Sequence, residues 1–163
     1  MMSFFMFIRA FSVRALFENT IFLSSLTSWI LAQIIKVLIV IFNGRRKPLK
    51  ELVEIVIWRT GGMPSSHAAT VASLTMAVGI REGLGSNLFV VCFFFALIVI
   101  RDAMGVRRSS GLQARALNLL GKNSGERLGF EYHPVKEIQG HSPLEVIVGT
   151  LLGIFIAAAY AWL

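Results

Sequence analysis

The sequence predicts an all-α fold: a polytopic integral membrane bundle of about four transmembrane helices plus short interfacial helices. Of its 163 residues, 55% are hydrophobic and 15% are charged, whereas soluble domains usually carry about a quarter charged residues. Four stretches are apolar enough to be candidate membrane spans, and a span takes roughly 20 residues. The length suits a single domain that covers residues 1–163.

The four expected spans differ in composition. The first covers about Thr20–Phe42, the third about Asn87–Met104 and the fourth about Pro143–Leu163, and all three are strongly apolar. The second, about Ser65–Ile80, is short and rich in Ala, Ser, Thr and Gly. That composition favours a helix packed closely among other helices, and two glycines in the fourth span have the same small-residue spacing.

Two further segments are expected to be helical outside the spans. Residues 1–18 are apolar at first but contain Arg9 and Arg14, and no small-residue cleavage site follows. We therefore expect an interfacial amphipathic helix rather than a signal peptide, with a flexible N-terminus as an equally good alternative. Residues 111–123 have the spacing of a helix and predict a surface helix.

Basic residues are concentrated in the first and last connections between the expected spans, which lie on the same side of a four-span protein. Basic loops are usually cytoplasmic, so we expect an integral protein of the plasma (inner) membrane with this face in the cytoplasm. The net charge of +7 suits an anionic partner. The apolar spans disfavour nucleic acid as that partner.

Reactive side chains lie at the four span ends that meet at this basic face. Topology therefore brings together residues that are distant in the sequence, whichever way the protein faces. Imidazoles, carboxylates, hydroxyls and cations together suit the binding and transfer of phosphate. The candidates are Lys36, Arg59, Ser65, Ser66, His67, Arg101, Asp102, Arg107, Arg108, His141 and Glu145.

The segment GGMPSSH begins the second expected span. Its glycines permit a tight turn, and Pro64 with Ser65 or Ser66 suits a helix start. The free N–H groups of a first helical turn favour an anion. His67 beside them can exchange a proton near neutral pH. Plain helix capping with a packed histidine explains the segment equally well.

The segment GHSPLEV begins the fourth expected span. Ser142 as N-cap, Pro143 at the first helical position and Glu145 three residues after the cap form the pattern of a capping box. The four-residue separation of His141 and Glu145 also lets the carboxylate orient the imidazole. The two interpretations are compatible.

The segment RDAMGVRR ends the third expected span. Arg101 and Arg108 are spaced to share a helix face, and arginine matches phosphate oxygens well. The alternative for Arg107, Arg108 and Lys36 is an anchor at the membrane edge. Asp102 either takes part in the site or neutralises a neighbouring arginine. Ionisable residues inside a span favour a functional role.

Other catalytic patterns are missing from the sequence. It has no Walker loop, no dinucleotide fingerprint and no G-x-S-x-G elbow. Two histidines with few carboxylates do not suit zinc, and we expect neither a metal nor another cofactor. His133 lies in a polar loop and is expected to be solvated. Cys92 is the single cysteine, so there is no disulfide framework.

At RTGGMPSSH, RDAMGVRR and GHSPLEV the sequence resembles the divergent branch of the phosphatidic acid phosphatase type 2 superfamily, which also contains the vanadium-dependent haloperoxidases. The resemblance runs from about Phe22 to the C-terminus. It implies a metal-independent phosphatase with a phosphohistidine intermediate. His141 would be the nucleophile, Glu145 its orienting carboxylate and His67 the general acid, with Ser66 where the superfamily has glycine.

Two positions depart from the superfamily's pattern. Val135 stands six residues before His141, and Asn43 stands seven residues after Lys36, where the superfamily has arginine. The phosphate-binding arginines must therefore come from elsewhere, and Arg59, Arg101, Arg107 and Arg108 are the candidates. We expect Lys36 to bind phosphate beside them.

Three functions remain open at this point. The first is a membrane phosphatase, with a lipid or polyprenyl phosphate as substrate because the site lies at the membrane edge. The second is a vanadate-dependent haloperoxidase. Such an enzyme shares the site but seldom has so hydrophobic a chain. In the phosphatase, vanadate would act only as an inhibitor. The third is a non-catalytic membrane protein that binds an anionic head group.

Overall fold

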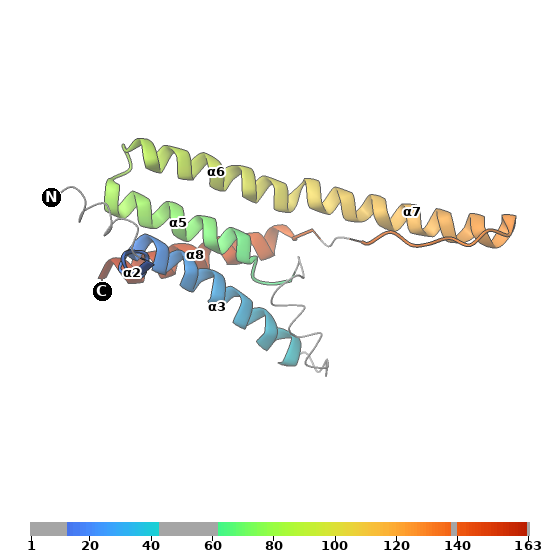
Figure 1. Ribbon diagram of the computed structural model, residues 1–163, viewed down its shortest axis with the longest axis horizontal. Coiled ribbons are helices and arrows are strands. Elements are labelled where there is room, and N and C mark those ends of the chain that lie inside the picture. Colours follow the sequence, from blue (N-terminus) through green and yellow to red (C-terminus); the bar gives the residue numbers. More distant parts are fainter. Residues whose placement is uncertain (1–12, 43–61, 138–139, 163) are drawn as a thin grey trace.

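The computed structural model describes residues 13–42, 62–137 and 140–162, and within them it contains helices and connecting segments but no strand. The helices are α2 (Val13–Phe17), α3 (Thr20–Phe42), α5 (Ser66–Glu82), α6 (Asn87–Met104), α7 (Val106–Leu128) and α8 (Pro143–Trp162) (Figure 1). The predicted all-α class is confirmed. Helices α3, α5, α6 and α8 occupy the four expected stretches, and their described bounds lie within two residues of those predicted.

Helices α3, α5, α6 and α8 lie side by side, and α5 is the central helix that packs against the other three (Figure 1). Among the described helices, α3, α8 and the continuous α6–α7 helix are long and apolar enough to cross a membrane. At 17 residues, α5 is shorter, and its buried residues are Ala, Ser and Val. The chain is therefore a membrane bundle with a short helix at its centre.

Two glycines bring the backbones of α5 and α8 into direct contact. A Cβ atom at Gly149 would overlap the carbonyl oxygen of Ser65, and one at Gly153 would overlap that of Ala69. The expected small-residue packing of these two helices is confirmed. Because no side chain separates the backbones, the first turns of α5 and α8 have one fixed position relative to each other.

Gly105 separates α6 from α7. Its φ of −100° and ψ of −80° depart from helical values. Hydrogen bonds nevertheless continue across the joint, since Gly105 N donates to Arg101 O at 2.9 Å and Ser109 N donates to Gly105 O at 2.9 Å. Helix α7 therefore extends beyond the bundle in the direction of α6 (Figure 1). It contains the predicted surface helix 111–123 and is longer at both ends.

Residues 129–137 return beside α7, and we call α7 and these residues the arm (Figure 1). The side chain of Asn118 holds the returning segment. Its oxygen accepts hydrogen bonds from Tyr132 Oη and Val135 N, both at 2.9 Å, and its nitrogen donates to Val135 O at 2.9 Å. Gly121 leaves room for the ring of Tyr132, which a Cβ atom would overlap.

The expected interfacial segment 1–18 is described only in part. Residues 13–17 form α2, a short helix whose residues are all exposed. Residues 1–12 lie outside the described residues, as does Arg59.

Candidate functional site

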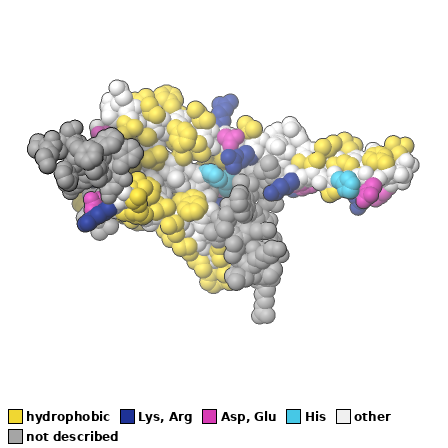
Figure 2. Space-filling model, viewed as in Figure 1, with side chains coloured by type: hydrophobic (Ala, Val, Ile, Leu, Met, Phe, Trp, Pro, Cys, Tyr) yellow, Lys and Arg dark blue, Asp and Glu magenta, His cyan; other side chains and the backbone are white. Residues whose placement is uncertain are grey.

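Backbone hydrogen bonds join the starts of α5 and α8 to the end of α6. Ser65 N donates to Glu145 O at 2.9 Å, and His141 N donates to Ala103 O at 3.1 Å. Figure 2 shows histidine, basic and acidic side chains gathered at this end of the bundle, where the arm leaves it. Three of the span ends that topology was expected to bring together are therefore in contact.

His141 lies immediately before α8 and is 2% exposed. Its Nδ1 is 3.0 Å from Oε2 of Glu145. Its Nε2 is buried and has no hydrogen-bond partner among the described residues. A carboxylate at Nδ1 favours the tautomer with the hydrogen on Nδ1, which leaves the lone pair on Nε2. The ring therefore presents one unshared basic nitrogen in a buried position.

Glu145 also caps α8, so both sequence interpretations hold together. Its Oε2 accepts a hydrogen bond from Ser142 N at 3.2 Å, while Glu145 N donates to Ser142 Oγ at 3.4 Å. These reciprocal bonds form the predicted capping box. The carboxylate that faces the imidazole is thus fixed by the first turn of its own helix.

Burial lowers the pKa of His141 from the ordinary histidine value. The hydrogen bond to Glu145 raises it, and the charges of Lys36 and Arg107 lower it further. The net effect is downward, because desolvation disfavours the charged imidazole most strongly. The neutral, nucleophilic form of His141 therefore persists to a lower pH than in a free histidine.

Lys36 lies on α3 and is 4% exposed, although it lies near the end of an apolar helix. Its Nζ donates a hydrogen bond to Ser66 Oγ at 3.2 Å, at the first turn of α5. Ser65 is the N-cap of that helix, since its hydroxyl accepts from Ala68 N at 3.4 Å. A buried cation beside a helix N-terminus makes this position favourable for an anion.

His67 lies in the first turn of α5 and is exposed. It is within electrostatic range of His141, Lys36, Arg107 and Asp102. The two histidines of the predicted motifs therefore influence each other electrostatically, although they are distant in the sequence. The site places a second imidazole and two cations around His141.

Asp102 and Arg107 form an ion pair across the joint between α6 and α7. Arg107 Nε is 2.7 Å from Asp102 Oδ2, and each side chain is about one-third exposed (37% and 36%). The structure thus contains the ion pair expected if Asp102 neutralises a neighbouring arginine. This pair holds Arg107, whose charge acts on both histidines.

The side chains of the remaining candidates form no bond to this cluster, or the residues lie outside those described; the backbone of Arg108 packs against Gly140, next to His141. Arg101 and Arg108 are exposed, and neither side chain forms a hydrogen bond or ion pair with a described residue. His133 is exposed on the returning segment of the arm, as expected for a solvated histidine. Arg59 falls outside the described residues. Within the described ranges, no group of three or more His, Cys, Asp and Glu residues is arranged to hold a metal ion.

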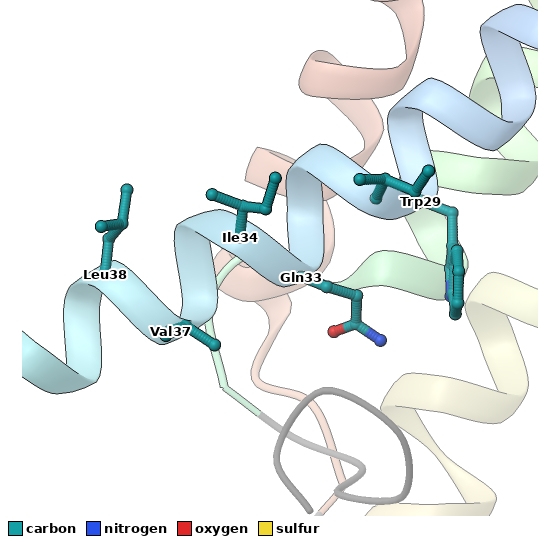
Figure 3. A pocket seen from close by; sticks show the side chains of 6 residues that line it. Trp29, Gln33, Ile34, Val37 and Leu38 are labelled. Atoms are coloured by element: carbon teal, nitrogen blue, oxygen red, sulfur yellow. The ribbon is translucent and has the colours of Figure 1, made fainter. Parts of the chain in front are cut away.

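An apolar hollow of about 240 Å³ lies on α3 (Figure 3). Successive turns of the helix line it with Trp29, Gln33 and Val37, together with Ile30, Ile34 and Leu38. Val37 and Leu38 directly follow Lys36 in the sequence. The hollow therefore spans the helical level of Lys36, although Lys36 itself does not line it.

The fold and the site define a polytopic helical membrane protein with a buried histidine–carboxylate pair at one end of its bundle. The chain belongs to the Divergent PAP2 family, whose model matches residues 17–156. It is also 39% identical over 158 residues to "Uncharacterized membrane protein YuiD" of Bacillus subtilis (strain 168), a match that covers 90% of this chain and 97% of that relative. No solved structure matches the chain significantly. The predicted family is confirmed.

Proposed function

We propose that this protein is a membrane phosphatase that hydrolyses a phosphate ester carried on a lipid or polyprenyl tail. The observation that carries the proposal is the buried imidazole of His141, with Glu145 at 3.0 Å from Nδ1 and no partner among the described residues at Nε2. A carboxylate-oriented imidazole with a free nitrogen suits a nucleophile. Membership of the Divergent PAP2 family supports the same class of reaction.

In the first step, Nε2 of His141 attacks phosphorus, and the bond between phosphorus and the ester oxygen breaks. Glu145 stabilises the positive charge that develops on the imidazole. His67 donates its proton to the departing oxygen, so the alcohol leaves neutral. Lys36 and Arg107 stabilise the charge on the non-bridging oxygens, where positioning and electrostatics supply most of the rate.

In the second step, water attacks the phosphohistidine. The bond between nitrogen and phosphorus breaks, inorganic phosphate is released, and His67 accepts the proton that the water loses. The first turn of α5, with Ser65 and Ser66, binds the phosphate oxygens through its free N–H groups. Asp102 acts through Arg107, which it holds at 2.7 Å.

Every group in this scheme belongs to the chain, so we propose that the reaction needs no metal or cofactor. Vanadate takes the place of the transferred phosphate and acts as an inhibitor. Phosphate release in the presence of a strong chelator tests the first statement directly.

The apolar hollow on α3 supports a substrate with a hydrocarbon tail. It extends along α3 from Leu38, past the level of Lys36, to Trp29. A phosphate held at Lys36 places an attached tail within reach of this surface. A soluble phosphate ester gains nothing from the hollow, so the proposal predicts preference for tailed substrates.

We place the site on the cytoplasmic face of the plasma membrane. The arm that leaves the site end carries Arg107, Arg108, Arg115, Lys122 and Arg127, and the basic side of a membrane protein usually faces the cytoplasm. A cysteine at His133, in a chain with Cys92→Ala, tests this placement. An impermeant thiol reagent added to intact cells should leave it unmodified and should modify it after lysis.

The experiment that tests the function is phosphate release by protein purified in detergent. The substrates are phosphatidic acid, a polyprenyl phosphate and p-nitrophenyl phosphate, each with a chelator present. Release by wild type and by His133→Ala, with loss in His141→Ala, is the expected result. If wild type binds a tailed phosphate and releases no phosphate from it, the protein is a head-group binder and the proposal is wrong.

A further inference from the structure

The arm leaves the bundle with an apolar face uncovered. Leu112, Leu117, Leu119 and Leu120 are between 51% and 64% exposed. The returning segment covers the opposite side of α7 through Asn118, so these leucines face away from it. Figure 2 shows hydrophobic side chains along the arm. A contiguous apolar face of this kind marks an interaction surface.

A row of cations borders the leucines. Arg108, Arg115 and Lys122 follow one another at intervals of seven residues, which places them in one line along the helix. Leu112 and Leu119, also seven residues apart, form the neighbouring line. Helix α7 has five basic residues and one acidic residue. An apolar face beside a basic row is typical of a helix that lies on an anionic membrane surface.

The charge pattern decides between a bilayer and a second copy of the chain. In a parallel pair of arms, the rows of Arg108, Arg115 and Lys122 would flank the contact from both sides and repel each other. Anionic head groups complement the same row, at a gain of about fivefold in binding for each cation near the surface. The row therefore favours lipid.

The arm joins the bundle at its base, where Gly105 links α7 to α6 and Gly140, next to His141, packs against the backbone of Arg108. Among the described residues, α7 packs against α6 and makes no comparable contact with α3, α5 or α8. The backbone of Gly105 already departs from helical geometry. A change of backbone angles at Gly105 would bend the arm at this base.

We propose that the arm is a membrane-surface element: it pivots at Gly105 and lays its leucine face on an anionic bilayer, with the row of Arg108, Arg115 and Lys122 at the head groups. The joint that pivots also holds the site. Ala103 O accepts the bond from His141 N at 3.1 Å, and Asp102 is paired with Arg107 across the joint. This inference stands without the phosphatase activity.

The test measures how deeply a fluorescent label on the arm enters the bilayer. The full chain with Cys92→Ala and Leu120→Cys is labelled and reconstituted into vesicles that contain nitroxide-labelled lipid as quencher. One set of vesicles is phosphatidylcholine alone, and the other is phosphatidylcholine and phosphatidylglycerol in equal parts. The matched control carries the label at Glu131→Cys, an exposed position on the returning segment.

We expect quenching at position 120 to increase severalfold in the anionic vesicles and to fall again at high salt, while position 131 changes little. Replacing Arg115 and Lys122 by Gln should weaken the lipid-bound state about fivefold for each cation removed. Equal quenching in both vesicle types, or equal quenching at both positions, would overturn the proposal. Protection of position 120 that follows protein density rather than phosphatidylglycerol would assign the face to a second copy instead.

Discussion

Oε2 of Glu145 lies 3.0 Å from Nδ1 of His141 and 3.2 Å from the backbone nitrogen of Ser142. One carboxylate oxygen therefore orients the imidazole and caps the helix that carries it. A substitution at Glu145 changes both the chemistry and the stability of the protein. The effects on chemistry and on stability can be separated by a substitution at Ser142, which removes part of the cap and keeps the contact between Glu145 and His141.

Glu145→Gln should lower kcat/KM on the order of 10²–10⁴-fold, because the imidazole loses its orienting charge. Ser142→Ala is the matched control, since it removes the hydroxyl that caps Glu145 N and keeps the contact between Glu145 and His141. The control should cost about 1 kcal/mol of stability with near-normal activity. Kinetics and thermal unfolding of both variants test this, and equal activity losses would refute the orienting role.

The pH profile should show an acid limb that lies below the ordinary pKa of histidine. Burial lowers the pKa of His141, so the neutral nucleophile is lost only when the pH falls beyond the usual range. Glu145→Gln removes an influence that raises this pKa and should move the limb further toward acid pH. Lys36→Met removes an influence that lowers it and should move the limb upward. The measurement is kcat/KM against pH for the three proteins.

Lys36→Met should weaken phosphate binding without harming the fold. The ammonium group is buried and its described partner is Ser66 Oγ, so its burial carries a desolvation cost that methionine removes. We expect KM and the inhibition constant of vanadate to rise by at least about tenfold, while thermal stability stays the same or increases. A large loss of stability with unchanged vanadate inhibition would assign Lys36 a structural role.

Gly149→Ala should destabilise the bundle and reduce activity together. The added Cβ overlaps the carbonyl oxygen of Ser65, so α5 and α8 must move apart, at a cost of about 1–3 kcal/mol. Gly85→Ala is the control, because nothing lies within 4 Å of the Cβ position there. Thermal unfolding in detergent and phosphate release should show both losses only in Gly149→Ala.

Ile34→Trp should fill the hollow on α3 and act only on tailed substrates. We expect KM for phosphatidic acid or a polyprenyl phosphate to rise severalfold, while kcat/KM for p-nitrophenyl phosphate stays unchanged. Leu151→Trp, at a 61% exposed position on α8, is the control for adding an aromatic ring to the lipid-facing surface. The same change for tailed and soluble substrates would exclude the hollow as the tail site.

Much of the fold could be predicted because the length of the apolar stretches and the residues that start and end helices determine the helices of a membrane protein. The starts at Asn87 and Pro143 follow a capping serine and a Ser-Pro step, and the sequence predicts both to the residue. Helix α7 was predicted too short, because its hydrophilic ends lack the apolar periodicity by which surface helices are recognised. The collinear path through Gly105 depends on backbone angles that no residue type specifies.

The sequence predicts which span ends meet, but not which side chains contact one another there. Topology alone required the span ends to meet, and the backbone bonds of Ser65 and His141 show that three of them do. The direction in which a side chain points depends on the rotation of its helix. Spacing could therefore not reveal that Arg107 pairs with Asp102 while Arg101 is exposed. Backbone bonds such as that from His141 N to Ala103 O leave no signal in the sequence.

The most direct test of the account is to trap the phosphoryl group on the enzyme. Protein turning over a radiolabelled tailed phosphate is quenched in alkali, where a phosphohistidine survives, and its peptides are mapped. The account predicts acid-labile label on the peptide that contains His141, present in His133→Ala and missing from His141→Ala. Label on another residue, or phosphate release by His141→Ala at the wild-type rate, would contradict it.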